Sequence, residues 1–139
     1  MPGSQPETAC DTSIVSDIRQ IVCVLDCLDA DRLADFWAAL LGYDRGPFQP
    51  PYVTLTDPRK GSVELLLQQV PEAKSGKNRM HLDLRVADME AALSRARALG
   101  ATVLAGPTAD DGWITTLLAD PDGNEFDLLV PPAGHPSLA

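Results

Sequence analysis

The sequence has little positive charge, few aromatic residues and no long apolar run. Its 139 residues include 11 Lys and Arg against 20 Asp and Glu, which gives a formal net charge of −9. A chain without clustered cations lacks the electrostatic footprint of a nucleic-acid or anionic-membrane binder. No stretch reaches the roughly 20 apolar residues of a membrane span, and the first residues lack the apolar segment of a signal peptide. We therefore expect a cytoplasmic protein with neutral or cationic partners and no nucleic-acid or membrane partner.

The short motifs of several enzyme classes are also missing. There is no P-loop, no dinucleotide-binding glycine motif and no Gly-x-Ser-x-Gly, so nucleotide and serine-hydrolase chemistries have no support. The three cysteines are Cys10, Cys23 and Cys27. Four residues of strand would separate the last two by about 13 Å, about twice what a disulfide tolerates. We predict free thiols that pack as small apolar side chains.

The length and the hydrophobic content of 45% predict one compact domain with its own core. Residues 1–16 and 132–139 are rich in proline and small polar residues without apolar periodicity, so we interpret both as tails. The folded domain is then expected between residues 17 and 131.

The elements of the first half follow from hydrophobic periodicity. The segment 18–29 is strand-like in its β-branched content and precedes a helix from Asp29, the expected N-cap, to Gly42, the expected C-terminal stop. Two strands, within 52–58 and 61–70, are expected around an Asp-Pro-Arg-Lys-Gly turn at 57–61. The polar stretch 71–79 is interpreted as a linker.

The same order begins again after the linker. A strand over 81–86 precedes a helix that Asp88 caps and Gly100 ends. A short strand is expected over 102–107, followed by a hairpin over 113–130 whose turn is Asp-Pro-Asp-Gly-Asn at 120–124.

The two halves form an internal repeat. The helix caps Asp29 and Asp88 lie 59 residues apart, and the Asp-Pro turns lie 63 residues apart. These two shifts make four positions equivalent: Val22, Glu64, His81 and Asp127. We predict an α+β fold in which two tandem β-α-β-β-β units, about 17–70 and 79–131, form a curved mixed sheet around a cup. The sheets pair edge to edge, and the helices cover the outer face.

Alternation along the strands predicts which side chains line the cup. The apolar sides of the strands suit the helices, so the polar sides face the cup, which is acidic. The predicted lining comprises Val22, Val24, Asp26, Glu64, Leu66, Gln68, His81, Asp83, Arg85, Glu125 and Asp127.

These features resemble one superfamily. The tandem arrangement, the segments DADRLADFWAALLGY and HLDLRVADMEAALSRARALGA and the turn LADPDGNEFDLL are similar to the glyoxalase, bleomycin-resistance and extradiol-dioxygenase superfamily, also called vicinal oxygen chelate proteins. The resemblance covers nearly all of 17–131 and is closest to small single-domain glyoxalase-like members. It implies a homodimer whose cups hold either a divalent metal with an oxygenated substrate or an intact antibiotic without a metal.

The resemblance also implies a metal site. In metal-using relatives the ligands come from the start of each unit's first strand and from each unit's last strand, where this chain has the four repeat positions. We predict Glu64, His81 and Asp127 as ligands of a divalent ion (Mn, Fe, Ni, Zn or Mg); Val22 departs from the pattern because valine cannot ligate. The metal would act as a Lewis acid in a lyase, isomerase or dioxygenase, with Glu64 or Asp127 as the catalytic carboxylate that moves a proton.

A metal-free binding cup is the alternative hypothesis. In that case His81 only forms hydrogen bonds, and Arg85 neutralises Asp83 or Asp127. An acidic cup attracts small cationic or aromatic metabolites, such as antibiotics.

The ligand-binding side chains would be Tyr52, Arg85 and Trp113. Tyr52 and Trp113 open equivalent strands of the two units, and either ring can stack on a planar ligand. Both hypotheses predict a homodimer, because twofold pairing covers sheet edges or the cup rim that one chain leaves exposed.

Overall fold

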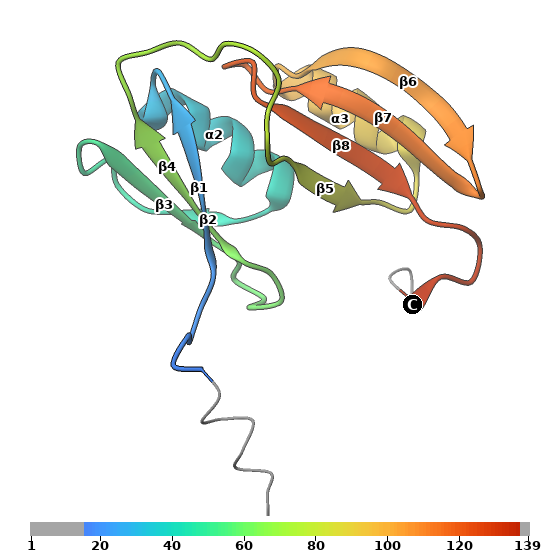
Figure 1. Ribbon diagram of the computed structural model, residues 1–139, viewed down its shortest axis with the longest axis horizontal. Coiled ribbons are helices and arrows are strands. Elements are labelled where there is room, and N and C mark those ends of the chain that lie inside the picture. The colour runs from blue at the N-terminus through green and yellow to red at the C-terminus, as the bar shows by residue number, and fades with distance from the viewer. Residues whose placement is uncertain (1–15, 137–139) are drawn as a thin grey trace, which may run out of the picture.

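The first repeat unit forms a four-stranded sheet with one helix. The structure, a computed structural model, describes residues 16–136 and is drawn in Figure 1. The strands follow the order β1-β4-β3-β2, and β1 runs parallel to β4. The elements are β1 (Val22–Cys27), α2 (Ala30–Leu41), β2 (Asp44–Arg45), β3 (Tyr52–Thr56) and β4 (Glu64–Gln69).

The second unit repeats this topology. Its sheet has the order β5-β8-β7-β6, and β5 again runs parallel to the last strand, β8. The elements are β5 (Leu82–Arg85), α3 (Met89–Leu99), β6 (Thr102–Asp110), β7 (Trp113–Ala119) and β8 (Glu125–Val130). The predicted α+β fold with two tandem units is therefore confirmed.

Both helices begin and end where the sequence predicts. The Asp29 carboxylate accepts a hydrogen bond from the Arg32 amide at 3.1 Å, and the Asp88 carboxylate accepts one from the Ala91 amide at 3.2 Å. Gly42 and Gly100 follow the helices with φ of 70° and 117°, a conformation that glycine adopts without a Cβ penalty. Neither helix in residues 16–136 is long and apolar enough to cross a membrane.

Two strands differ from the prediction. The strand β2 was not predicted, because it has only two residues and aspartate is rare in strands. In the structure it pairs with β3, and ion pairs from Arg45 to Asp31 and Asp35, at 2.8 and 2.9 Å, fix it beside α2. β6 extends to Asp110 rather than ending near 107, and its pairing with β7 changes register twice, which masks the alternation expected of a strand.

The two sheets stay separate, so the expected edge-to-edge pairing is wrong. Among the described residues no ladder joins β1 to β5, and each is the edge strand of its own sheet. The two strands run in clearly different directions in Figure 1, which prevents ladder hydrogen bonds between them. A twofold partner would cover these edges, and the homodimer remains a prediction.

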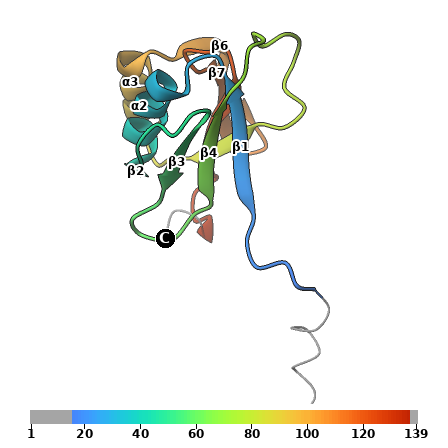
Figure 2. The same ribbon diagram turned by 90° about the vertical axis from the view of Figure 1, so that its left-hand side faces the viewer.

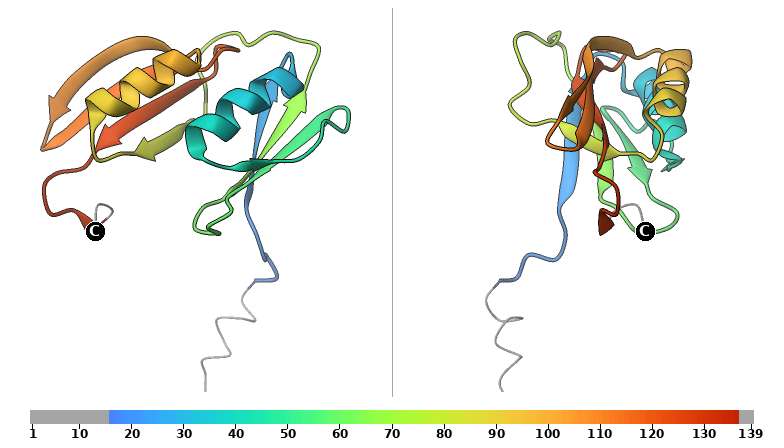
Figure 3. Two further views of the ribbon diagram at one scale, coloured as in Figure 1. Left: turned by 180° about the vertical axis from the view of Figure 1, so that it is seen from behind. Right: turned by 90° about the vertical axis from the view of Figure 1, so that its right-hand side faces the viewer.

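A shared apolar core joins the units instead. Trp37 of α2 and Phe126 of β8 are both buried, with ring centroids 5.0 Å apart, and Phe36 packs edge-on against Trp37 at 5.2 Å. Figures 2 and 3 show both helices on one side of the molecule, against the same side of both sheets. We call the opposite side of each sheet its open face.

The turn between β7 and β8 also joins the units. The buried Asp120 carboxylate accepts hydrogen bonds from the Asp122 and Asn124 amides and from the Trp37 indole N–H, each at 2.9 Å. The Asn124 side chain donates to the Asp26 carbonyl of β1 at 3.2 Å. Burial raises the pKa of Asp120, and these donors oppose the rise.

Its repeat equivalent, Asp57, organises its turn in the same way, but within residues 16–136 it forms no hydrogen bond to the other unit. Asp57 accepts hydrogen bonds from the Arg59 and Gly61 amides at 2.9 and 3.1 Å and pairs with the Arg59 guanidinium. These bonds hold the pKa of Asp57 below its usual range. The turn at Asp57 therefore stabilises only its own unit, whereas the turn at Asp120 connects the two units.

This pair supplies an internal control for stability. We expect Asp120→Ala to lower the free energy of unfolding by about 3 kcal/mol, because it leaves the Trp37 N–H and two turn amides without acceptors in a buried site. Asp57→Ala should cost at least about 1 kcal/mol less, since Arg59 and its turn lie nearer to solvent. Urea unfolding of both variants measures the difference, and equal costs would contradict the linking role of Asp120.

Candidate functional site

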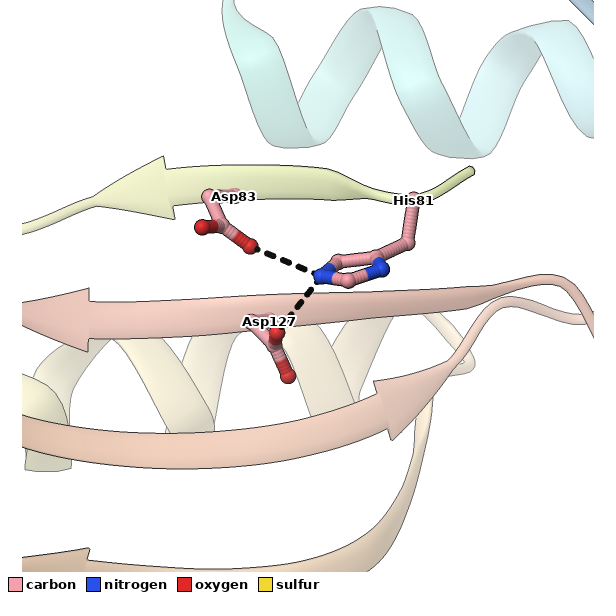
Figure 4. Close-up of side chains that lie close together, drawn as sticks. All are labelled: His81, Asp83 and Asp127. Carbon is pink, nitrogen blue, oxygen red and sulfur yellow. Dashed lines mark ion pairs between the residues drawn. The ribbon is translucent and has the colours of Figure 1, made fainter. Parts of the chain in front are cut away.

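The open face of the second sheet carries three converging polar side chains. Asp83 of β5 and Asp127 of β8 are direct ladder partners, so their side chains share a face. His81 lies two residues before Asp83, at the start of the strand, and so points to the same side. Figure 4 shows all three on the face opposite α3. We call this group the His81 cluster.

Short distances hold the cluster together. His81 Nε2 lies 3.2 Å from Asp83 Oδ1 and 3.1 Å from Asp127 Oδ2. The side chains of His81 and Asp83 are 42% and 52% exposed, whereas that of Asp127 is 16% exposed. The cluster is thus reachable from solvent, with Asp127 at its base.

The donor set fits a divalent cation. One nitrogen and two carboxylate oxygens lie within 4.8 Å of one another. Two adjacent ligands with bonds of about 2.1 Å lie about 3 Å apart around an ion, which matches the observed nitrogen–oxygen distances. Three such ligands would leave positions open for an oxygenated molecule.

The electrostatics of the cluster favour a cation. Burial raises the pKa of Asp127, and the hydrogen bond and negative charge of Asp83 raise it further. His81 and Lys77 act in the opposite direction more weakly. Two facing carboxylates therefore resist ionising together, and a bound divalent ion would relieve that repulsion.

The cluster overlaps the predicted metal set without reproducing it. It contains His81 and Asp127, and it contains Asp83 in place of Glu64. Glu64 pairs with Val22 on the open face of the first sheet and lines a hollow with Lys60 and Ser62.

The sequence did not identify Asp83 as a candidate ligand, because the ladder pairing in the second unit is shifted by two residues from the pairing that the repeat implies. Val22 and Glu64 share a ladder position in the first unit, but in the second unit Asp127 pairs with Asp83, two residues after His81. An offset of two keeps every side chain on the same face, so the pattern of alternation does not reveal it. Only the pairing of β5 with β8 identifies Asp83 as the neighbour of Asp127.

The predicted ligand-binding residues are partly brought together. The Arg85 guanidinium carbon lies 5.4 Å from the centre of the Trp113 ring, and the His135 ring lies 5.2 Å from that ring. Arg85 forms no ion pair with Asp83 or Asp127 in residues 16–136, contrary to expectation, because it stacks on Trp113. Tyr52 lies on β3 of the other sheet, 42% exposed.

A cavity of about 720 Å³ lies between the units, and we call it the seam cavity. Its walls come from the edge strands β1 and β5, the end of α2 and one side of α3. Most of the lining is apolar, and Asp83 of the His81 cluster belongs to it. The candidate cation site therefore adjoins a space of the size that small-molecule sites have.

The cysteines behave as predicted within the described residues. Cys23 and Cys27 are free thiols; Cys27 is buried, and its burial raises the pKa of the thiol to about 12. Cys23 is half-buried and lines the seam cavity. Cys10 lies outside the described residues.

A family model and several solved structures match the chain. A model described as a glyoxalase-like domain matches residues 22–129. A glyoxalase/bleomycin resistance protein/dioxygenase family enzyme from Burkholderia phytofirmans PsJN has a TM-score of 0.66 at 18% identity, covering 78% of this chain and 95% of that chain. No curated protein matches the sequence.

Two further structures are similar. TnmS3, an antibiotic binding protein from Streptomyces sp. CB03234, has a TM-score of 0.63 at 26% identity, covering 84% of this chain and 98% of that chain. The oxidase ChaP-H2 has a TM-score of 0.63 at 22% identity, covering 86% of this chain and 98% of that chain.

The raised pKa of Asp127 predicts a pH-dependent effect of Asp127→Asn. A carboxyl group with a raised folded-state pKa stabilises the fold most below its unfolded pKa, and this contribution is lost as pH rises through the folded pKa. In EDTA, we expect the variant to match the wild type near pH 3 and to become the more stable protein as pH rises. Thermal unfolding from about pH 3 to 8 measures this.

Asp26→Asn, on the open face of the other unit, is the matched control and should show no such trend. If the wild type is instead more stable than Asp127→Asn throughout this pH range, the prediction is wrong, and the ion pair with His81 contributes more to stability than the repulsion between the two carboxylates costs.

Proposed function

Because the chain belongs to the glyoxalase-like domain family, we propose that it binds a divalent cation through His81, Asp83 and Asp127 and, with it, a small oxygenated organic molecule. The observation that supports this most is the convergence of His81 Nε2 on two carboxylate oxygens at 3.1 and 3.2 Å. Oxygen-rich sets with one imidazole suit Mn²⁺, Fe²⁺ and Mg²⁺, and Ni²⁺ and Zn²⁺ also accept such ligands.

The bound cation would supply Lewis-acid stabilisation of negative charge on a substrate oxygen. The chain's own residues would do the rest. The Arg85 guanidinium, which lies over Trp113 on the same open face as the His81 cluster, would attract a negatively charged group. Glu64, the second predicted catalytic carboxylate, lies on the other sheet's open face. This arrangement suits a lyase, an isomerase or a dioxygenase.

Metal binding is tested by elemental analysis of untagged protein and by thermal shifts with Mn²⁺, Fe²⁺, Ni²⁺, Zn²⁺ and Mg²⁺. A cation at a hundredfold excess over its Kd should stabilise the wild type by about 2.7 kcal/mol. His81→Ala and Asp83→Asn should each remove the shift, since each deletes a ligand.

Glu64→Gln is the matched control, because it removes a carboxylate from the equivalent ladder position of the first unit. It should keep the full shift. A shift lost in Glu64→Gln and kept in Asp83→Asn would restore the ligand set expected from the repeat. No bound metal and no shift with any ion would refute the proposal.

Metal-free ligand binding is the second candidate function. The stacking of the exposed Arg85 on the half-buried Trp113 beside the His81 cluster favours it, because a guanidinium–indole pair offers a flat surface to an aromatic ligand. The likeness to TnmS3, an antibiotic binding protein, also favours it.

A panel of aromatic antibiotics titrated in EDTA distinguishes this function. We expect Trp113→Ala or Tyr52→Ala to weaken binding about tenfold, the loss of one stacking contact of about 1.4 kcal/mol, and His81→Ala to leave it unchanged. A larger loss in His81→Ala than in either aromatic variant would count against metal-free binding.

A further inference from the structure

The seam cavity carries positive charge in an otherwise acidic protein. Its lining includes Arg59 and Arg95. Asp83 and Arg85 also border it as residues of β5, but their side chains contact His81 and Trp113 on the open face. The remaining lining is mostly apolar, with side chains such as Leu65 and Leu84. The net charge of −9 therefore does not describe this site.

Two of the arginines gather at the end of α2. Arg95 of α3 donates to the Ala39 carbonyl at 2.7 Å, and Arg59 donates to the Leu41 carbonyl at 3.4 Å. These carbonyls belong to the last turn of one helix, so both guanidinium groups reach the same end of the cavity. Neither bond to a carbonyl neutralises a cation.

The charge of these groups is only partly compensated. Arg59 pairs with Asp57, whereas Arg95 and Arg85 have no carboxylate within ion-pair distance in the part of the chain that the structure describes. Arg85 meets only the face of Trp113. Guanidinium groups with unused donors beside apolar walls are suited to an anion whose body is apolar.

We propose that the seam cavity binds an organic carboxylate with an apolar body, with the carboxylate held by Arg95 and Arg59 and the body packed along β5. This inference goes beyond the proposed function, because Arg95 and Arg59 lie at the end of α2 on the helix side of the sheets, whereas the His81 cluster lies on the open face. A volume of about 720 Å³ accommodates a small organic molecule of this kind.

Cys23 provides a direct readout of occupancy, because it lines the cavity and is half-buried. In a Cys10→Ser background, N-ethylmaleimide labelling reports on Cys23, since Cys27 is buried and its thiol ionises only at high pH. The probes are decanoate and decyltrimethylammonium, which have the same chain and opposite charge. Long-range attraction by an acidic protein favours the cation, so protection by the anion must come from the local arginines.

We expect decanoate to protect Cys23 and decyltrimethylammonium to protect it little. Arg95→Gln should raise the decanoate concentration needed for half-protection about tenfold, the value of one charge-assisted contact. Arg97→Gln, on the same helix but outside the cavity lining, is the matched control and should change it less than about twofold. Arg59→Gln, which removes the other guanidinium proposed to hold the carboxylate, gives a second test if Arg95→Gln does not fold.

Three outcomes overturn the proposal. The first is equal protection of Cys23 by the two probes. The second is an equal decanoate concentration for half-protection in Arg95→Gln and Arg97→Gln. The third is protection that increases with protein concentration in the absence of any probe, which would mean that a second copy covers the cavity.

Running the assay in EDTA and in Mn²⁺, with His81→Ala included, separates the two proposals. Decanoate protection without any metal shift refutes only the metal site, and a metal shift without decanoate protection refutes only the carboxylate site.

Discussion

The hydrogen bond between the Trp37 indole and the buried Asp120 carboxylate sets the relative position of the two units. No strand ladder joins the two sheets in residues 16–136, so their arrangement depends on side-chain contacts. Asp120 shapes the turn before β8 and accepts from α2 of the other unit, and Phe126 on β8 packs on the same tryptophan. A buried carboxylate must keep all its donors, which makes this arrangement specific. The seam cavity depends on that arrangement, because both units line it.

The two units share a frame and differ in the chemistry on it. At one ladder position the first unit has Val22 and Glu64, and the second has Asp83 and Asp127. The first open face is therefore partly apolar, with Val22 and Val24 exposed, whereas the second holds the His81 cluster. Strand pairing needs only backbone groups, so side chains on the open faces are free to differ.

Local charge and net charge point in opposite directions in this molecule. The acidic composition suggested neutral or cationic partners, and the carboxylates of the second open face agree with that expectation. The seam cavity, however, brings together Arg59 from the turn after β3 and Arg95 from α3, which are distant in sequence. A ligand responds to the potential at its site, which depends on the few charges nearest to it.

The sequence by itself determined both helices, the strands other than β2 and the end of β6, the duplication and the face of most strand residues, because caps, turns and alternation are local patterns. It therefore placed His81 and Asp127 on one face and predicted Asp29, Gly42, Asp88 and Gly100 as helix boundaries. Only the tertiary structure decided that Asp83 lies beside Asp127, that Arg85 stacks on Trp113, and that Arg59 and Arg95 both reach the end of α2. Ladder register and the packing of one unit on another arise from contacts between segments far apart in the chain, and a shift of two residues leaves every local pattern unchanged.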